Sequence, residues 1–460
     1  MFYMLKKIGL ASLFLALTCH WSASTSQTLT ASRTYSAAQL NEDLLFLKQA
    51  IGKTHPNLAH SVDTQRLDRA FKDVERQLQK PMTSEEAWRV VSTLNPVFAD
   101  GHLLVALPDI EKQAAAHVQS GLGFFPFEVQ VEANGDVYIL AELGGASSAL
   151  ASRRIETING IPAREIAALL LARTHGDTPE LRANILSTRW WRFYWKTFGA
   201  PSHFDLTIAK AGAYDTIGRA AVSKLPASLA SAADFEQQFK FELLPENTAL
   251  LTINTFWWPD KKLFYAFTKQ AFASIRDKNV TTLLIDIRRN TGGDDDMWKE
   301  GVLRYIADKP YRHGSTYQKM VLEGRQSASE KAGQVINGTI QSWEQPDSDN
   351  PFHFSGKTYV LVGRTSYSSA ILFSNTVQDF KFGTIVGARG YARARQSGGI
   401  QLFSLPHTKL SVVVPRFILD RPAGAGGPEL IQPDIVVADD PFNSRSLIDA
   451  LHAQIFDRTQ

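Results

Sequence analysis

The sequence predicts a multidomain protein of mixed α/β and α+β class, and three changes of pattern along the chain lead to that prediction. Apolar residues recur at helical spacing in the first part, alternate with a period of two in the middle, and form continuous strands between amphipathic helices in the last part. The length of 460 residues agrees, because a typical domain of about 150 residues gives roughly three domains. The expected parts are residues 36–110, 118–222 and 235–440, followed by a helical tail at 441–460.

The composition excludes several classes of function. Hydrophobic residues make up 44% of the chain, which is too many for a disordered protein, and a formal net charge of +3 provides no field for binding nucleic acid. The single cysteine, Cys19, rules out a disulfide framework and a multi-cysteine zinc or iron–sulfur site. We expect neither a metal ion nor another cofactor.

The first 24 residues have the pattern of a signal peptide. A basic pair precedes an apolar run at 8–17, and small residues follow at 22–24. The run is too short for a stable membrane span, which needs about 20 apolar residues. We therefore expect an exported protein, periplasmic or extracellular, whose mature chain has lost Cys19. A lipid anchor at Cys19 and a buried N-terminal helix are the alternatives.

The segment 36–110 is predicted to be an N-terminal helical bundle. Apolar residues recur on one helical face from Leu40 to Ile51 and again from Leu67 to Leu78. A third helix is expected to begin near Thr83, because Glu86 three residues later completes a capping-box pattern.

The segment 118–222 is predicted to be a β-rich module. Its alternating pattern is interrupted by Asn134-Gly135, a strong hairpin signal, and a second turn at Asn159-Gly160 leads into a helix. The aromatic cluster at 190–195 is expected to lie in the core. Ahead of the hairpin stands a glycine-rich loop whose N–H groups could approach an anion, with an ordinary turn as the alternative: Gly121, Leu122, Gly123 and Phe124.

The segment 235–440 is predicted to be an α/β core with a mostly parallel sheet covered on both faces, because continuous apolar strands alternate with amphipathic helices. Two strand-to-helix turns, 286–293 and 365–370, then fall at the carboxyl ends of strands, where ligands bind. The second turn places Ser368 at the start of a helix, with its hydroxyl in the positive field of the helix and the next N–H ready to stabilise an oxyanion.

Two familiar signals in this core have structural interpretations. The acidic run 294–296 stands at a helix start, where capping and the positive end of the helix dipole explain it better than a metal ion does. The segment 355–358 looks like the end of a phosphate-binding loop, but Pro351 stands where the first glycine belongs, and a strand follows instead of a helix.

Several motifs, taken together and in this order, resemble the tail-specific, or C-terminal processing, serine peptidases. They are THPNL at 54–58, FADGH at 98–102, DIRRNTGG at 286–293, TSYSSAILFSNTVQDFKFGTIVG at 365–387 and QPDIVV at 432–437. The resemblance implies a helical N-terminal part, a PDZ-like module and a catalytic α/β core of the ClpP/crotonase type.

The resemblance also implies the nucleophile and the oxyanion donors. The family nucleophile falls on Ser368, and the donors fall on the backbone of Ser369 and of Gly292 or Gly293. The structural alternatives are that the serines only cap the helix and that the two glycines only form a tight turn.

The general base is where the sequence departs from the best-known branch of the family. That branch has a lysine twenty-five residues after the serine, where this chain has Arg393, which stays protonated and cannot accept a proton. Branches resembling the tricorn-type core peptidases use a histidine, which falls on His102, with a structural turn residue as the alternative. Their orienting carboxylate falls on Glu429, with a surface glutamate as the alternative, and Gly101 stands where they have a second serine.

The sequence therefore predicts a secreted serine endopeptidase that cleaves unfolded or chain-terminal polypeptide segments, with the loop 121–124 as a substrate-binding element. No cofactor and no nucleic-acid partner are expected. The alternative is a catalytically inactive protein that binds a peptide or an apolar ligand on the same fold, which Arg393 and Ile371 would permit. A hydrogen-bond distance between Ser368 and His102 would favour the enzyme.

Overall fold

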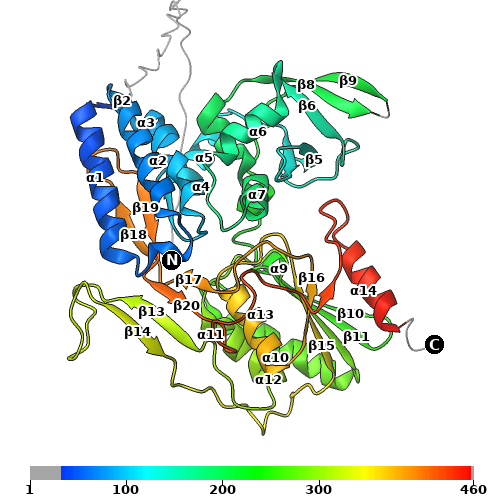
Figure 1. Cartoon of the computed structure of the whole chain (residues 1–460). Coiled ribbons are helices and arrows are strands. Elements are labelled where there is room, and N and C mark those ends of the chain that lie inside the picture. The colour runs from blue at the N-terminus through cyan, green and yellow to red at the C-terminus, as the bar shows by residue number, and fades with distance from the viewer. Residues whose placement is uncertain (1–32, 211, 457–460) are drawn as a thin grey trace, which may run out of the picture. The chain divides into compact units, whose positions relative to one another are not determined.

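The computed structural model describes residues 33–210 and 212–456, so the predicted signal peptide and Cys19 lie outside the described residues. From Thr34 onward the chain forms one compact unit. Figure 1 shows a helical N-terminal part, a middle module and a core built around a sheet.

The N-terminal part is a helical bundle, as predicted. The Thr83 hydroxyl accepts from the Glu86 N–H at 3.2 Å, and the Glu86 carboxylate accepts from the Thr83 N–H at 2.8 Å, which confirms the capping box. The elements are β1 (Thr34–Tyr35), α1 (Ala37–Thr54), η1 (Leu58–His60), α2 (Thr64–Gln77), β2 (Met82–Thr83), α3 (Ser84–Val91), η2 (Ser92–Leu94), α4 (Asn95–Phe98), β3 (Leu104–Ala106) and α5 (Ile110–Gln119).

Strands from the far end of the chain complete this bundle. In Figure 1 the orange strands β18 (Gln401–Ser404) and β19 (Ser411–Val414) lie beside the blue helices, and β19 pairs with β3 in an antiparallel sheet. The buried carboxylate of Asp43 in α1 accepts hydrogen bonds from the backbone N–H of His407 and Thr408 at 2.8 and 2.9 Å. Residues assigned to the core by sequence thus pack with the first part of the chain.

The middle module is an antiparallel sheet covered by two helices. Both predicted turns are present, with left-handed φ values of 87° at Gly135 and 49° and 77° at Asn159 and Gly160. The cluster at 190–195 is largely buried, as expected of core aromatics. The elements are β4 (Phe127–Val131), β5 (Val137–Glu142), β6 (Arg154–Ile158), β7 (Ile161–Pro162), α6 (Ala163–Leu171), α7 (Pro179–Phe198), β8 (His203–Lys210) and β9 (Ala213–Ala220), with α8 (Ala227–Ala230) following.

The core holds the predicted, mostly parallel sheet in the order β10-β11-β12-β15-β16-β21, in which only β10 is antiparallel to its neighbour. Side chains on one face pack against α10 and α13, and those on the other pack against α14, so both faces are covered. The elements are α9 (Phe235–Gln238), β10 (Phe239–Leu244), β11 (Thr248–Ile253), α10 (Lys261–Asp277), β12 (Thr282–Asp286), α11 (Asp295–Trp298), η3 (Lys299–Leu303), α12 (Arg304–Ile306), β15 (Lys357–Val362), α13 (Ser369–Phe380), β16 (Thr384–Gly387), β21 (Ile435–Val436) and α14 (Ser446–Phe456).

A second, smaller sheet in the core bridges to the N-terminal part. Its order is β14-β13-β20-β17, which places β17 (Gln396–Gly398) at one edge. The other strands are β13 (Thr316–Met320), β14 (Val335–Thr339) and β20 (Phe417–Leu419). The chain leaves β17 directly for β18, so the residues of β17 lie beside the loop that precedes β3.

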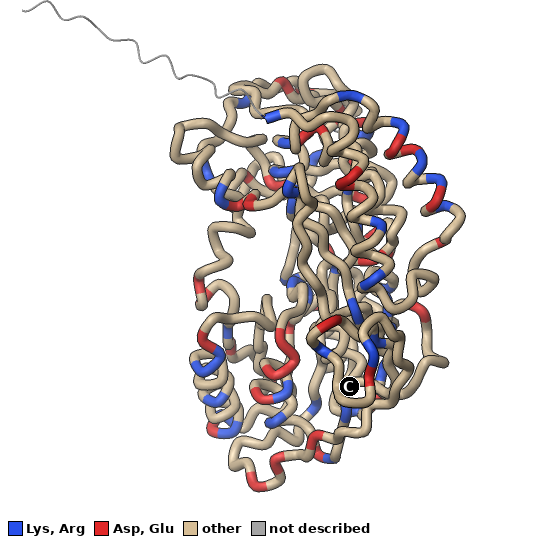
Figure 2. Tube along the Cα trace, turned by 90° about the vertical axis from the view of Figure 1, so that its left-hand side faces the viewer, with Lys and Arg blue, Asp and Glu red and all other residues tan. Residues whose placement is uncertain are grey.

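Charged residues of both signs are interspersed along the chain in Figure 2, in keeping with the small net charge. Within the described ranges, no helix is both long and apolar enough to cross a bilayer.

Candidate active site

Ser368 lies in a strained turn between β15 and α13. Its φ of 56° and ψ of −125° form a conformation that residues with a side chain rarely adopt, and such strain is found at functional sites. The Ser368 N–H donates to the Gln396 side-chain oxygen at 3.2 Å, which helps to hold the turn. The side chain is half-buried, so its hydroxyl is held in place and still reachable.

The two neighbouring serines have structural roles. The Ser366 hydroxyl donates to the Ile287 carbonyl at 2.7 Å and accepts from the Gly363 N–H at 3.0 Å, which ties the turn to the end of β12. The Ser369 hydroxyl accepts from the Trp298 indole at 2.9 Å and donates to the Asp295 carboxylate. The acidic run at the start of α11 therefore positions the start of α13.

His102 reaches Ser368 from the loop between α4 and β3. Its Nε2 lies 3.0 Å from the Ser368 Oγ, and its ring packs at 4.8 Å between centroids on the ring of Tyr367. The structure thus brings together two residues that the sequence separates by 266 positions.

Behind the imidazole runs a chain of hydrogen bonds through Ser397 and Asp100. His102 Nδ1 lies 3.0 Å from the Ser397 Oγ, which in turn lies 2.8 Å from Asp100 Oδ1. An ionised carboxylate can only accept, so Ser397 donates to Asp100 and accepts from the Nδ1–H of His102. This direction leaves Nε2 unprotonated and facing the Ser368 hydroxyl, which is the tautomer that a general base requires.

Asp100 is buried and His102 is half-buried, and this removal from water affects the charge of the site. Burial lowers the pKa of His102, although the nearby Asp100 charge and the Ser397 hydrogen bond act to raise it. Burial also acts to raise the pKa of Asp100, but hydrogen bonding and the charges of His55 and His102 outweigh it and hold that pKa below its ordinary value. The resting pair is therefore a neutral imidazole and an ionised carboxylate.

The structure does not bring Glu429 to His102. The Glu429 side chain is 79% exposed, and its carboxylate lies 3.7 Å from the Arg393 guanidinium. Arg393 itself binds the Ala99 carbonyl with its side chain and donates its N–H to Asp177 at 2.9 Å. The arginine at the family's lysine position therefore braces the loop that carries His102 and does not face Ser368.

Sequence reasoning missed Asp100 and Ser397. Asp100 stands two residues before His102 in the FADGH motif, so the motif contained the signal. Ser397 belongs to no such motif, and it reaches His102 only because β17 leads into the strands that join the N-terminal bundle.

Asp177 and Tyr367 enclose the same loop from the other side. Tyr367 donates its hydroxyl to Asp177 at 2.8 Å, and both side chains accept from the Gly101 N–H, at 3.0 and 2.9 Å. Burial, with the Asp100 charge, raises the pKa of Asp177 to about 6. Any side chain at Gly101 would collide with the Tyr367 ring, because a Cβ there would lie 2.4 Å from Cζ.

Replacement of Gly101 by serine, the residue of the tricorn-type pattern, is therefore expected to destabilise the protein by about 1–3 kcal/mol through overpacking. It should also lower peptidase activity by displacing His102. Chemical denaturation and peptide cleavage measure the two effects. Gly52→Ala is the control, because Gly52 is exposed in α1 with open space around it and should gain about 0.5–1 kcal/mol. A Gly101→Ser protein as stable as the parent would contradict the packing argument.

Two backbone N–H groups near Ser368 are free to bind an oxyanion. The Gly292 N–H already donates to the Asn290 side chain at 2.8 Å. The N–H groups of Gly293 and Ser369 have no acceptor in the part of the chain that the structure describes. Gly292 makes the close approach possible, because at its φ of 104° a Cβ would lie 2.7 Å from the Ser368 Cβ.

The structure gives little support to the loop 121–124 as a carboxylate nest. The N–H groups of Gly121, Leu122 and Phe124 all donate to backbone carbonyls of this chain, which leaves only that of Gly123. The edge of β4 is covered as well, because the Val131 N–H donates to the Ser187 hydroxyl of α7 at 2.8 Å. A peptide could not add to this edge as a strand without displacing α7.

Comparison with known proteins gives one family and several similar folds. Residues 247–437 match the model of peptidase family S41. The crystal structure of mature CPAF is similar with a TM-score of 0.62 and 14% identity, over 92% of this chain and 98% of that chain. The structure of mature CPAF complexed with lactacystin is similar with a TM-score of 0.61 and 15% identity, over 92% of this chain and 97% of that chain. The photosystem II D1 C-terminal processing protease has a TM-score of 0.46 and 16% identity, over 88% of this chain and 94% of that chain. No curated protein matches the sequence.

The likeness to CPAF shows the fold alone at these identities, and it confirms the predicted mixed α/β class over nearly the whole chain. The family match falls on the segment that carries Ser368, Gly292 and Gly293.

Proposed function

Because residues 247–437 belong to peptidase family S41, which makes the protein a serine-type peptidase, we propose that Ser368 is its nucleophile and His102 its general base. The observation that carries the proposal is the directed chain from the Ser368 hydroxyl through His102 and Ser397 to Asp100, with each step at 2.8–3.0 Å. Such a chain is the arrangement by which a weak hydroxyl nucleophile is activated.

In the first step, Ser368 Oγ attacks the peptide carbonyl carbon while His102 Nε2 takes the hydroxyl proton. The imidazolium that forms is stabilised by the buried Asp100 carboxylate, which acts through Ser397 and also accepts from the backbone N–H of His102 at 2.7 Å. His102 then gives its proton to the leaving amine, and a water molecule hydrolyses the acyl-enzyme by the same route in reverse.

The N–H groups of Gly293 and Ser369 are assigned as the hydrogen-bond donors that stabilise the negatively charged oxygen of the tetrahedral intermediate. They are the candidate donors that remain unpaired in the described chain, and Ser369 is the first residue of α13, where the helix dipole favours an anion. Gly292 serves by its lack of a side chain instead of by its N–H.

We extend the proposal to the substrate class predicted from the sequence, an unfolded or chain-terminal polypeptide segment. Ser368 and His102 are both half-buried, and an extended segment can reach such a recessed pair more readily than a folded surface can. Cleavage of a reduced, unfolded polypeptide by the parent protein and its loss in Ser368→Ala test the assignment. Export to the periplasm or the cell exterior remains part of the proposal.

The low pKa of His102 predicts the acid limb of the pH profile. Catalysis needs the neutral imidazole, so kcat/KM should rise with pH through the pKa of His102 in the free enzyme. Burial places that pKa below the ordinary 6.5, so the midpoint of the rise should lie below pH 6.5 and most of the activity should be present at pH 7. A midpoint above 6.5 in the measured pH profile would contradict this account.

A further inference from the structure

His55 is a buried histidine beside the proposed relay, which is the chain of hydrogen bonds from Ser368 through His102 and Ser397 to Asp100. It is the C-cap residue of α1 and the second residue of the THPNL motif. Its side chain is 0% exposed, and its Nε2 lies 3.9 Å from Asp100 Oδ2. A side chain so placed cannot touch a substrate, so any part that it has in the reaction acts through Asp100.

The backbone fixes the orientation and the tautomer of the His55 ring. The Asn57 N–H donates to His55 Nδ1 at 3.2 Å, so Nδ1 carries no proton and the ring N–H is on Nε2. The backbone N–H of His55 donates to the Ile51 carbonyl at 2.9 Å, which holds the residue at the end of α1. The ring therefore presents a fixed N–H donor to the Asp100 carboxylate.

The two oxygens of the Asp100 carboxylate have different surroundings. Oδ1 accepts from the Ser397 hydroxyl at 2.8 Å and from the backbone N–H of His102 at 2.7 Å. Oδ2 has no hydrogen-bond partner among residues 33–210 and 212–456, and neither has His55 Nε2. A buried polar atom without a partner is costly, so each of these two atoms is the natural partner of the other. Their separation of 3.9 Å is about 1 Å longer than a hydrogen bond, and bonds at active sites often tighten only when substrate binds.

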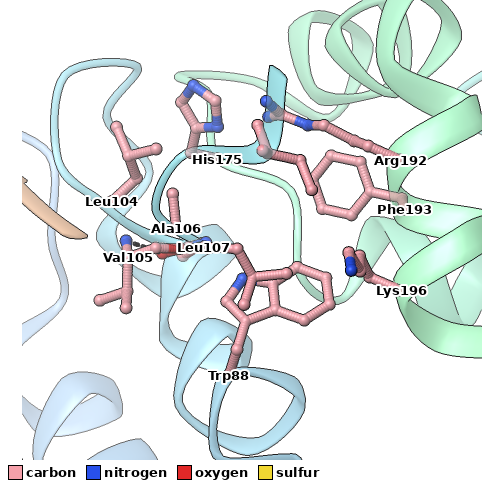
Figure 3. A pocket seen from close by; sticks show the side chains of 11 residues that line it. Trp88, Leu104, Val105, Ala106, Leu107, His175, Arg192, Phe193 and Lys196 are labelled. Carbon is pink, nitrogen blue, oxygen red and sulfur yellow. Dashed lines mark hydrogen bonds between the residues drawn. The ribbon is translucent and has the colours of Figure 1, made fainter. Parts of the chain in front are cut away.

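The backbone of the loop that carries Asp100 is held by contacts that do not involve His55. The Asn95 side chain donates to the Val105 carbonyl at 3.0 Å and accepts from the Val105 N–H at 2.8 Å, and dashed lines at Val105 in Figure 3 mark these bonds. At the other end of the loop, the Ala99 carbonyl accepts from the Arg393 guanidinium. Loss of the His55 ring should therefore act on the Asp100 carboxylate and leave the course of the loop unchanged.

The charge of Asp100 decides the direction of the relay. An ionised carboxylate only accepts, so the proton of His102 stays on Nδ1 and Nε2 is free to accept from Ser368. A protonated Asp100 could donate to Ser397, and the reversed chain would place the proton on Nε2. Burial acts to raise the pKa of Asp100, and the interaction with His55 is the largest of the effects that bring it below its ordinary value. A donor at Oδ2 therefore favours the form of Asp100 that the relay needs.

We propose that His55 is a positioning residue that donates its Nε2–H to Asp100 Oδ2, and that it thereby keeps the carboxylate ionised with Oδ1 turned toward Ser397. This inference rests on the proposed function, because it concerns the relay that activates Ser368. The relay then extends from the reacting hydroxyl to the end of α1, the first helix of the N-terminal part.

The test compares variants of the full-length protein by steady-state kinetics on a fluorogenic unfolded substrate. His55→Asn keeps an acceptor for the Asn57 N–H but has no donor that reaches Asp100. His55→Gln is the conservative replacement, because it carries an amide N–H at about the reach of Nε2. His407→Asn is the matched control, because it breaks a histidine–carboxylate pair outside the relay, between His407 and Glu42 of α1 at 2.6 Å. The double variant His55→Asn/Asp100→Asn completes the set.

His55→Asn is expected to lower kcat by about 10- to 100-fold and to change KM by less than about twofold, because the buried ring does not touch substrate. His55→Gln should keep kcat within about threefold of the parent value, because the donor is retained. His407→Asn should leave kcat unchanged. In the Asp100→Asn background, His55→Asn should lower kcat by less than about threefold further, since the group on which it acts is already lost.

Full kcat in a folded His55→Asn protein overturns the inference. An equal loss in His55→Gln also overturns it, as does a loss in His55→Asn that multiplies the loss in Asp100→Asn. If His55→Asn does not fold, His55→Phe takes its place, because it keeps the size of the ring and lacks the donor. Activity that survives in Ser368→Ala or Asp100→Asn rejects the proposed relay, and this inference with it. Loss of activity in those two variants beside full kcat in His55→Asn rejects only the role of His55.

Discussion

Replacement of Ser368 by alanine is expected to lower kcat/KM for an unfolded polypeptide by at least about 10⁴-fold, because no other hydroxyl of the turn faces His102. Ser366 and Ser369 are held by Ile287 and Asp295 and cannot take its place. The measurement is cleavage of a fluorogenic unfolded substrate by purified parent and variant proteins with matched circular dichroism spectra.

Two control variants separate chemistry from structure. Ser366→Ala removes buried hydrogen bonds and is expected to cost about 1–3 kcal/mol of stability while retaining much of the activity. Ser368→Gly is expected to be as inactive as the alanine variant but more stable by about 1–3 kcal/mol, because glycine adopts a φ of 56° and a ψ of −125° without strain. An active Ser368→Ala protein would refute the nucleophile assignment.

Asparagine at position 100 is expected to lower kcat by about 10²- to 10⁴-fold. The asparagine amide can donate to Ser397, which would then donate to His102 Nδ1 and leave the proton on Nε2, the nitrogen that must accept from Ser368. Ser397→Ala removes the link itself and is expected to lower kcat by about 10- to 10³-fold. Steady-state kinetics should show the loss in kcat and little change in KM.

Glu429→Gln is the matched control for these variants, because it changes a carboxylate to an amide at a site 79% exposed and in contact with Arg393 instead of His102. We expect it to retain nearly full activity. The pH profile adds a second readout. The Asp100 charge raises the pKa of His102. Asp100→Asn removes that charge, so its acid limb should move to lower pH. A large loss in Glu429→Gln beside an active Asp100→Asn would show that the wrong carboxylate has been chosen.

The parts of the structure that sequence could predict are those with local signals. The pattern of apolar residues predicts the parallel sheet, and the turn residues Asn134-Gly135 predict the hairpin. A glycine pair before a helix indicates the turn at Gly292. The proposed nucleophile and the proposed base could be named only because a family motif surrounds each of them.

The orientation of the base could not be predicted, because it depends on contacts between distant parts of the chain. Ser397 lies 295 residues from His102, in a short strand without a recognisable pattern. The position of Glu429 relative to Pro433 resembles the family pattern, but spacing along the chain does not tell where a loop side chain points. Three N–H groups of loop 121–124 donate to backbone carbonyls of the fold, and the spacing of its glycines does not reveal this use.

Arg393 illustrates how a departure from a family pattern can have a structural use. It cannot act as a base, but it connects the Ala99 carbonyl and Asp177 to the segment before β17, and so braces the loop that carries His102.

The most direct test of the central claim is labelling of the parent protein with a fluorophosphonate, followed by mass spectrometry of its peptides. The account predicts one adduct, on Ser368, that is absent in Ser368→Ala and forms much more slowly in His102→Ala. An adduct on another residue, or labelling that persists unchanged in Ser368→Ala, would contradict it.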